Sequence, residues 1–85
     1  MKNIENIIET KKVYKTLLNK NLIIQYKKSK IKILKWFFSW IDFKQRQPKK
    51  DEIYSFRINK QFRAFARFVD NSTLLVYHID NHQNY

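Results

Sequence analysis

The sequence predicts an α+β domain in which two N-terminal helices pack on a small, mainly antiparallel sheet, in the order β-α-α-β-β-β. Two observations predict this class. Apolar residues recur at helical spacing between Thr10 and Phe38, whereas they alternate with other residues along segments between Tyr54 and Asp80. The chain has 85 residues and no internal repeat or low-complexity segment, so we expect residues 1–85 to form a single domain.

The N-terminal segment Asn3–Glu9 contains three isoleucines, and we interpret it as a short strand rather than the beginning of a helix. Thr10 is expected to cap a helix that continues to about Leu18, because a threonine hydroxyl accepts a hydrogen bond from the first helical turn. The residues expected on its buried stripe are Val13, Leu17 and either Tyr14 or Leu18. The segment Asn19-Lys20-Asn21 then ends the helix.

A second helix is predicted from about Leu22 to Phe38. Its buried positions, which follow helical spacing, are Ile23, Tyr26, Ile33, Leu34 and Phe37. The lysines of this segment lie largely elsewhere, and we expect a solvated face rather than a binding site. The aromatic residues Trp36, Phe37, Phe38 and Trp40 are expected in the core rather than on a surface that stacks nucleobases.

A basic loop is predicted from Asp42 to Glu52, around the only proline, Pro48. We expect RNA contacts from the cationic residues of this loop and from one lysine beyond it: Lys44, Arg46, Lys49, Lys50 and Lys60. The remainder of the chain is predicted to form three strands.

Alternation along the first two of these strands gives one apolar face and one arginine-bearing face. The apolar side carries Tyr54, Phe56, Ile58, Phe62, Ala64, Ala66 and Phe68, and the opposite side carries Ser55, Arg57, Asn59, Arg63, Phe65 and Arg67. The last strand, Thr73 to about Asp80, should be central because it is apolar on both faces. One face carries Leu75, Tyr77 and Ile79, and the other carries Leu74, Val76 and His78. Since the chain has no glycine, Asn59-Lys60-Gln61 and Asp70-Asn71-Ser72 are expected to turn on left-handed Asn and Asp residues.

The charge of the chain indicates an anionic partner. Its 18 Lys+Arg and 7 Asp+Glu give a net charge of +11, which attracts nucleic acid, an anionic membrane or an acidic protein. The absence of cysteine excludes a disulfide framework and a thiolate zinc site. The N-terminus lacks a signal-peptide pattern, and the apolar patch Trp36–Ile41 is too short to span a bilayer, so we expect a soluble, cytoplasmic protein without a membrane partner.

The sequence contains no glycine-rich phosphate loop, paired-carboxylate site or metal cluster, and we expect no metal and no cofactor. His78 and His82 are four residues apart, but a strand does not bring such residues together. This leaves metal-free cleavage of RNA, in which cations stabilise the phosphorane and other groups transfer protons. Arg57 and Arg63 are candidates for the cations, and His82 and Tyr85 for proton transfer. The alternatives are surface charge for the arginines and a disordered C-terminal tail.

The segment Tyr54-Ser-Phe-Arg-Ile-Asn-Lys-Gln-Phe-Arg63 resembles the strand, turn and arginine of the RelE/ParE superfamily of type II toxins. The ending His82-Gln-Asn-Tyr85 is similar to the C-terminus of its YoeB-type members. The likeness covers most of the chain and is specific from about Phe43 onward. It implies that Arg63 contacts the scissile phosphate and that Arg57 lies near a basic family position. His82 and Tyr85 would correspond to the catalytic C-terminal pair, with two residues between them. The family's glutamate base has no counterpart, and Glu52 is the nearest acid.

The resemblance implies a toxin that acts as a metal-independent ribonuclease on mRNA at the ribosome and is neutralised by a small acidic antitoxin. ParE-like members of the superfamily instead inhibit gyrase and lack the catalytic residues. A third possibility is a non-enzymatic RNA-binding module, which needs the arginines but no proton-transfer pair. Arg63, His82 and Tyr85 favour the ribonuclease.

Overall fold

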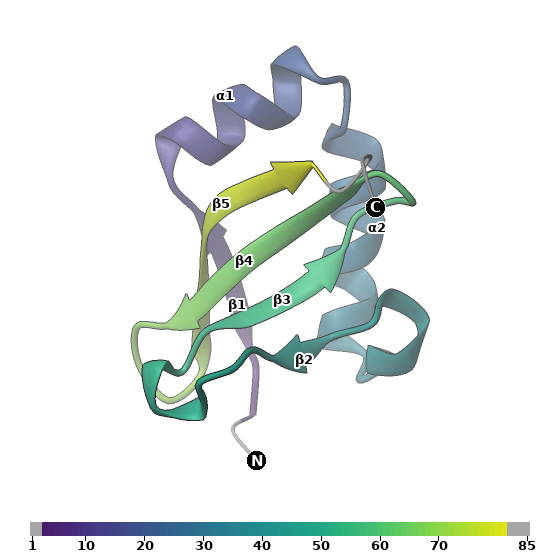
Figure 1. The fold of residues 1–85 in the computed structure, drawn as a ribbon. Helices are drawn as coiled ribbons and strands as arrows, with labels where there is room; N and C mark the ends of the chain where they lie inside the picture. Colours follow the sequence, from purple (N-terminus) through teal and green to yellow (C-terminus); the bar gives the residue numbers. More distant parts are fainter. Residues whose placement is uncertain (1–2, 82–85) are drawn as a thin grey trace.

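The fold is an α+β arrangement of two helices and one five-stranded sheet, taken from a computed structural model that describes residues 3–81 (Figure 1). The elements are β1 Asn6–Glu9, α1 Lys11–Asn19, α2 Ile23–Leu34, β2 Lys44–Gln45, β3 Tyr54–Arg57, β4 Phe62–Phe68 and β5 Thr73–Asn81, with short 3-10 helices η1 Phe38–Ile41 and η2 Lys49–Asp51. The predicted class is confirmed. The predicted basic loop, however, contains a short strand, β2, that was not expected, since Lys44 and Gln45 pair with Ser55 and Tyr54.

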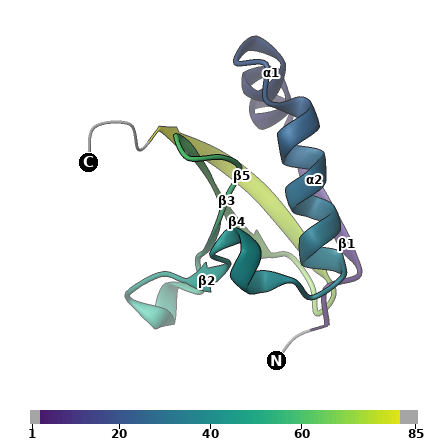
Figure 2. The ribbon, with the colours of Figure 1, turned by 90° about the vertical axis from the view of Figure 1, so that its right-hand side faces the viewer.

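The sheet has the order β1-β5-β4-β3-β2, with β1 parallel to β5 and all other neighbours antiparallel. The last strand is therefore an interior strand, as predicted. Both α-helices lie on one side of the sheet, as its edge-on view shows, and within residues 3–81 the opposite side carries no α-helix (Figure 2). This uncovered side is called the open face below.

The α1 helix begins as predicted, because the Thr10 hydroxyl accepts a hydrogen bond of 3.1 Å from the Val13 amide. It ends at Asn19 and is followed by a left-handed residue, Asn21, with φ 61°. The amides of Asn21 and Leu22 then donate to carbonyls of the last helical turn. Val13 and Leu17 are buried. The expectation that Tyr14 or Leu18 completes the buried stripe was wrong, because both are exposed.

The α2 helix is shorter than predicted and ends at Leu34 instead of Phe38. Trp36 adopts φ 67°, and the amides of Trp36 and Phe37 donate to the carbonyls of Ile33 and Lys32. This is the same C-terminal motif as in α1, although here a tryptophan takes the place that glycine usually fills. The motif turns the chain away from the helix axis. As a result Leu34 and Phe37, which were predicted to be buried, are exposed.

A β-bulge separates the two halves of β5. Phe65 is opposite His78 and Ala66 is opposite Val76, so Tyr77 is an additional residue in β5. Side chains after the bulge therefore change sides relative to strict alternation. Val76 and Ile79 both pack in the core, and the prediction that Val76 and His78 share a face was wrong.

Two predicted turns use Asn and Asp in a different way from the one expected. The Asn59 side-chain oxygen accepts hydrogen bonds of 2.8 Å from the amides of Gln61 and Phe62. The Asp70 carboxylate likewise accepts hydrogen bonds from the amides of Ser72 and Thr73. These bonds lower the pKa of Asp70, and the bond from the Ser72 amide has the largest effect. Within residues 3–81, left-handed backbone occurs instead at Asn21, Trp36, Asp42 and Glu52.

The core lies between the helices and the sheet. Its fully buried members include Leu17 of α1, Ile33 of α2, Phe56 of β3 and Leu74 of β5. Tyr26 of α2 stacks on Phe56 with ring centroids 6.3 Å apart, and its hydroxyl donates to Glu9 at 2.7 Å. Burial, together with this carboxylate, raises the pKa of Tyr26 well above its usual range. The Tyr26 hydroxyl, which is buried between helix and sheet, therefore has a hydrogen-bond acceptor in Glu9.

Replacing Phe56 with alanine should lower the free energy of unfolding by about 3–5 kcal/mol, since the ring is fully buried and its removal leaves a cavity. Ile24→Ala is the matched control, because Ile24 is 71% exposed and should change stability by less than about 0.5 kcal/mol. Urea unfolding followed by far-UV circular dichroism measures both. Similar losses for the two variants would contradict the assigned core.

Candidate nucleic-acid interface on the open face

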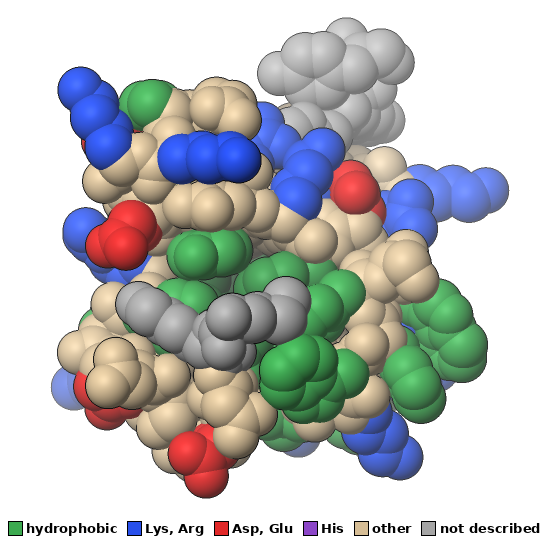
Figure 3. Space-filling view, turned by 90° about the horizontal axis from the view of Figure 1, so that it is seen from below, with side chains coloured by type: hydrophobic (Ala, Val, Ile, Leu, Met, Phe, Trp, Pro, Cys, Tyr) green, Lys and Arg blue, Asp and Glu red, His purple; other side chains and the backbone are tan. Residues whose placement is uncertain are grey.

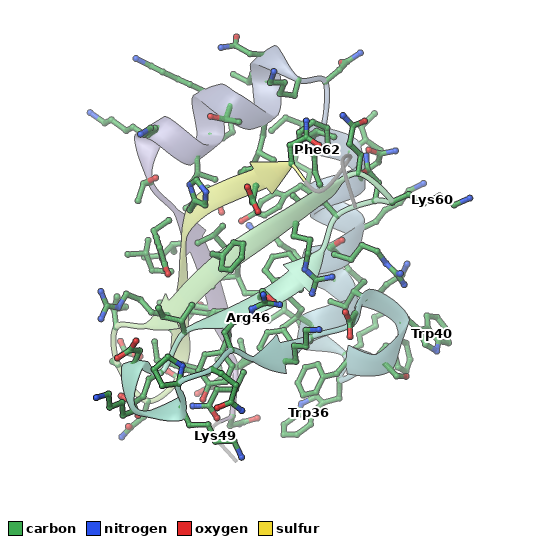
Figure 4. All side chains as sticks on the ribbon, viewed as in Figure 1. Trp36, Trp40, Arg46, Lys49, Lys60 and Phe62 are labelled. Carbon is green, nitrogen blue, oxygen red and sulfur yellow. The ribbon has the colours of Figure 1, made fainter. Side chains whose placement is uncertain are left out.

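Arginine side chains gather on the open face of the sheet, which is the side seen in Figure 4. The strand register places Arg57 of β3 opposite Arg63 of β4. Arg46, which follows β2, lies across the same face, with its guanidinium carbon 5.6 Å from the centre of the Phe65 ring (Figure 4). The predicted arginine-bearing face therefore exists, and neither α1 nor α2 covers it.

Arg63 is held in place by three hydrogen bonds. Its Nη1 donates to the Asp42 carboxylate at 3.1 Å, and its Nη2 donates to the Asp42 carbonyl at 3.1 Å and the Ser55 hydroxyl at 3.2 Å. The side chain is only 14% exposed. Its buried Nε has no hydrogen-bond partner among the described residues. Arg63 is thus a fixed positive charge, and an anion that binds to it must compete with Asp42.

Asp42 is the acidic partner that sequence reasoning missed. It adopts a left-handed conformation with φ 52° at the end of η1. Its carboxylate also lies 3.5 Å from the Lys44 ammonium. Partial burial alone would raise the pKa of Asp42, but the charges of Arg63 and Lys44 outweigh this and lower it. The residue gave no signal in the sequence because its partners lie on other strands.

Arg57 is more available than Arg63. Its side chain is exposed, and one nitrogen, Nη2, donates to the backbone carbonyl of Trp40 at 3.3 Å. A guanidinium has five N–H groups, so the remaining donors of Arg57 can bind a phosphate in the bidentate manner that such groups favour.

Phe65 and His78 form an aromatic pair at the centre of the open face. Their ring centroids are 5.9 Å apart, and the ring planes are tilted by 49°. The bulge at Tyr77 produces this pair, because it turns His78 to the side that carries Phe65. Phe65 also lies under the Arg46 guanidinium. An aromatic ring flanked by a cation and an imidazole suits stacking against a nucleobase.

The remaining predicted RNA-binding residues do not form one cluster with the arginines. Lys44 lies beside Asp42 on β2, whereas Lys49 and Lys50 are exposed on η2 and Lys60 is exposed in the β3–β4 turn. Figure 4 shows Lys49 and Lys60 at different edges of the molecule. His82 and Tyr85, the predicted proton-transfer pair, lie outside the described residues. The last described residue, Asn81, pairs with Phe62 next to Arg63.

Residues 3–81 offer neither a metal site nor a membrane span. No group of three or more His, Asp or Glu side chains in this range converges on a possible metal site. In the same range, no helix has the length and apolar character needed to cross a bilayer.

Comparisons of the chain with protein-family models, with curated proteins and with solved structures found no match. The resemblance to the RelE/ParE superfamily remains a prediction from the sequence.

The Asp42–Arg63 pair should make stability depend on acid. Because folding lowers the pKa of Asp42, the pair stabilises the fold above the unfolded pKa of about 3.9, and this contribution disappears as the pH falls through the lower, folded pKa. Its size should be at most about 1 kcal/mol, since Asp42 is open to solvent. Asp42→Asn should therefore flatten the loss of stability below about pH 4, measured by urea unfolding at several pH values.

The matched control is Asp51→Asn, because the exposed Asp51 carboxylate makes no ion pair in the described part of the chain. An equal loss of unfolding free energy below about pH 4 in wild type and Asp42→Asn would show that the Asp42–Arg63 pair contributes nothing measurable to stability.

Proposed function

We propose that this chain is the toxin of a type II toxin–antitoxin system, a metal-independent ribonuclease that cleaves mRNA on the ribosome in the cytoplasm. The observation that carries the proposal is the sheet face without an α-helix that carries Arg46, Arg57 and Arg63 together with the Phe65–His78 pair. Cations and an aromatic platform on one surface are what a single-stranded RNA needs for its phosphates and one of its bases.

In the proposed reaction, Arg57 and Arg63 stabilise the negative charge that develops on the phosphorane. Arg63 is suited to this because its guanidinium is already fixed, so that little reorganisation accompanies the reaction. Phe65 orients the RNA by stacking. Proton transfer is assigned to His82 or Tyr85, as the sequence resemblance implies. His78 is a second candidate because its imidazole lies on the same face.

A partner protein is part of the proposal. A net charge of +11 on 85 residues creates self-repulsion that an acidic protein would relieve. An acidic antitoxin that binds only the folded state would also stabilise this small domain by mass action.

One observation favours a second candidate function. The Asp42 carboxylate occupies one edge of the Arg63 guanidinium, as a phosphate would in a nuclease. This arrangement suits a binding protein whose arginine is structural, either a ParE-like gyrase inhibitor or a non-enzymatic RNA-binding module. The discriminating experiment incubates the purified protein with ribosome-bound mRNA and, in parallel, with gyrase in a supercoiling assay. Cleavage supports the ribonuclease, whereas inhibited supercoiling without cleavage supports the gyrase inhibitor.

Cleavage should depend on Arg63 through the transition state. Arg63→Lys keeps the positive charge but loses the planar fork, so single-turnover cleavage should fall by about 100-fold or more while RNA binding changes much less. His82→Ala and Tyr85→Phe should each slow cleavage, and the residue that transfers a proton should shift the pH–rate profile. His78→Gln tests the second proton-transfer candidate in the same way.

Arg67→Lys is the matched control, since Arg67 is an exposed arginine of the same strand and has no assigned role. Undiminished cleavage by folded Arg63→Lys would remove Arg63 from the mechanism.

RNA binding should depend on the aromatic platform. Phe65→Leu keeps an apolar side chain but loses the ring, and should weaken binding of a short single-stranded RNA by about 1–3 kcal/mol, or roughly 5- to 150-fold. Arg46→Gln should weaken binding and reduce the slope of log affinity against log salt by about 0.7, the value for one phosphate contact. Fluorescence anisotropy of labelled RNA measures both quantities.

The control for Arg46→Gln is Lys12→Gln, which removes one positive charge from α1, away from the open face. A reduction of the slope by the α1 variant equal to that of Arg46→Gln would assign RNA binding to net charge rather than to this face.

A further inference from the structure

A second distinctive surface lies where α2 ends and η1 begins, and we name it the α2–η1 patch. It consists of five exposed apolar residues: Ile31, Leu34, Trp36, Phe37 and Trp40. Trp36 is 48% exposed and Trp40 is 61% exposed, and Phe37 is exposed too. The prediction that the aromatic residues of this segment lie in the core was therefore wrong for these three, and only Phe38 packs against the core. In the view from below, hydrophobic side chains gather at the centre and on the right of the molecule (Figure 3).

The rings of the patch are ordered by contacts with one another. Phe37 and Trp40 stack with centroids 4.7 Å apart, and Trp36 stacks on the partly buried Phe38 at 5.5 Å. Between the helix and η1 they leave a hollow of about 250 Å³, which is lined by Lys28, Ile31, Lys32, Lys35, Phe37 and Trp40. The patch therefore contains a preformed apolar hollow, beside which the rings of Trp36 and Trp40 are about half exposed.

The backbone at Trp36 gives a reason to assign a role to the patch. A left-handed conformation costs a residue with a Cβ roughly 1 kcal/mol or more, and glycine would relieve this cost at the same place in the helix-ending motif. The chain instead carries a large aromatic ring there, of which about half is exposed. Backbone strain that is tolerated together with an exposed side chain points to a use for that side chain.

The rim of the depression is basic. Lys28, Lys32 and Lys35 all line it, and within residues 3–81 none of their ammonium groups lies in ion-pairing distance of a carboxylate. Lys32 lies over the Trp40 ring, with Nζ 6.0 Å from its centre. On the helix, Ile24 and Ile31 alternate with Lys28 and Lys35 along one row, about 16 Å long at 1.5 Å per residue. Apolar and cationic groups thus follow each other over three helical turns.

We infer that the α2–η1 patch docks an amphipathic helix of a partner protein, with apolar side chains in the depression and acidic side chains against the three lysines. Three turns of exposed helix match the length of such a segment, and the unpaired lysines provide charge complementarity. The hollow is lined by Ile31 beside the Phe37 and Trp40 rings and suits an apolar side chain, whereas a nucleobase would also need polar partners for its edges.

The inference concerns a surface other than the open face, so it holds whether or not the chain cleaves RNA. The two tryptophans of the chain, Trp36 and Trp40, both belong to the patch, so intrinsic fluorescence reports on this surface directly. The probe is a designed helical peptide of about 20 residues with leucines at helical spacing, glutamates elsewhere and no Trp or Tyr. Its binding should shift tryptophan emission to shorter wavelength and saturate. A peptide of the same composition with scrambled order should not.

The matched variants carry equal charge changes at different places. Lys28→Glu/Lys35→Glu should weaken peptide binding by at least about tenfold at physiological salt, where screening limits charge effects to about 8 Å. Lys12→Glu/Lys20→Glu on and after α1 should weaken it by less than about threefold. All four lysines are exposed, so both variants should fold.

The inference fails if the two variants weaken binding equally, if the peptide binds without moving tryptophan emission, or if no binding occurs up to about 1 mM. It also fails if anionic vesicles or single-stranded RNA produce the emission shift at lower concentration than the peptide does, because the patch would then serve a membrane or RNA.

Discussion

The organisation of this domain depends on the contacts that hold the segment between α2 and β3 against the sheet. The two residues that follow η1, Asp42 and Phe43, make these contacts in opposite directions. Asp42 turns outward and binds Arg63 on the open face, whereas Phe43 turns inward and stacks with Phe38, Tyr54 and Phe56. The left-handed conformation of Asp42 makes the change of direction possible. Because both contacts arise from one short segment, η1 and β2 hold a fixed position. The α2–η1 patch and the arginines of the open face are therefore held in place as well.

The same segment connects the two surfaces to which functions are assigned, the open face and the α2–η1 patch. Arg57 of the open face donates to the carbonyl of Trp40, whose ring belongs to the α2–η1 patch. A protein segment docked on the patch would therefore sit beside a cation of the proposed RNA site. This proximity offers a physical route by which an acidic partner reduces RNA binding, since its charge would act on Arg57 at short distance.

The character of the open face follows from two departures from regular structure. The bulge at Tyr77 turns His78 toward Phe65 and leaves Val76 and Ile79 in the core. The ion pair with Asp42 converts Arg63 from a free surface cation into a held one. The cost of the pair is small because Asp42 remains open to water, yet the geometry of the guanidinium is fixed by three hydrogen bonds.

Local patterns in the sequence determined the class of fold, both helix starts to within a residue or so, the Thr10 cap, the β3 to β5 strands and the side of the sheet that carries Arg57 and Arg63. These follow from side-chain period and capping chemistry, which act over a few residues. Only the tertiary structure decided the rest. The end of α2 at Leu34 depends on a left-handed Trp36 that propensity does not favour, and the face of His78 depends on a bulge that strict alternation conceals. The pairing of Asp42 with Arg63 joins residues 21 positions apart, and no local pattern specifies a contact between them.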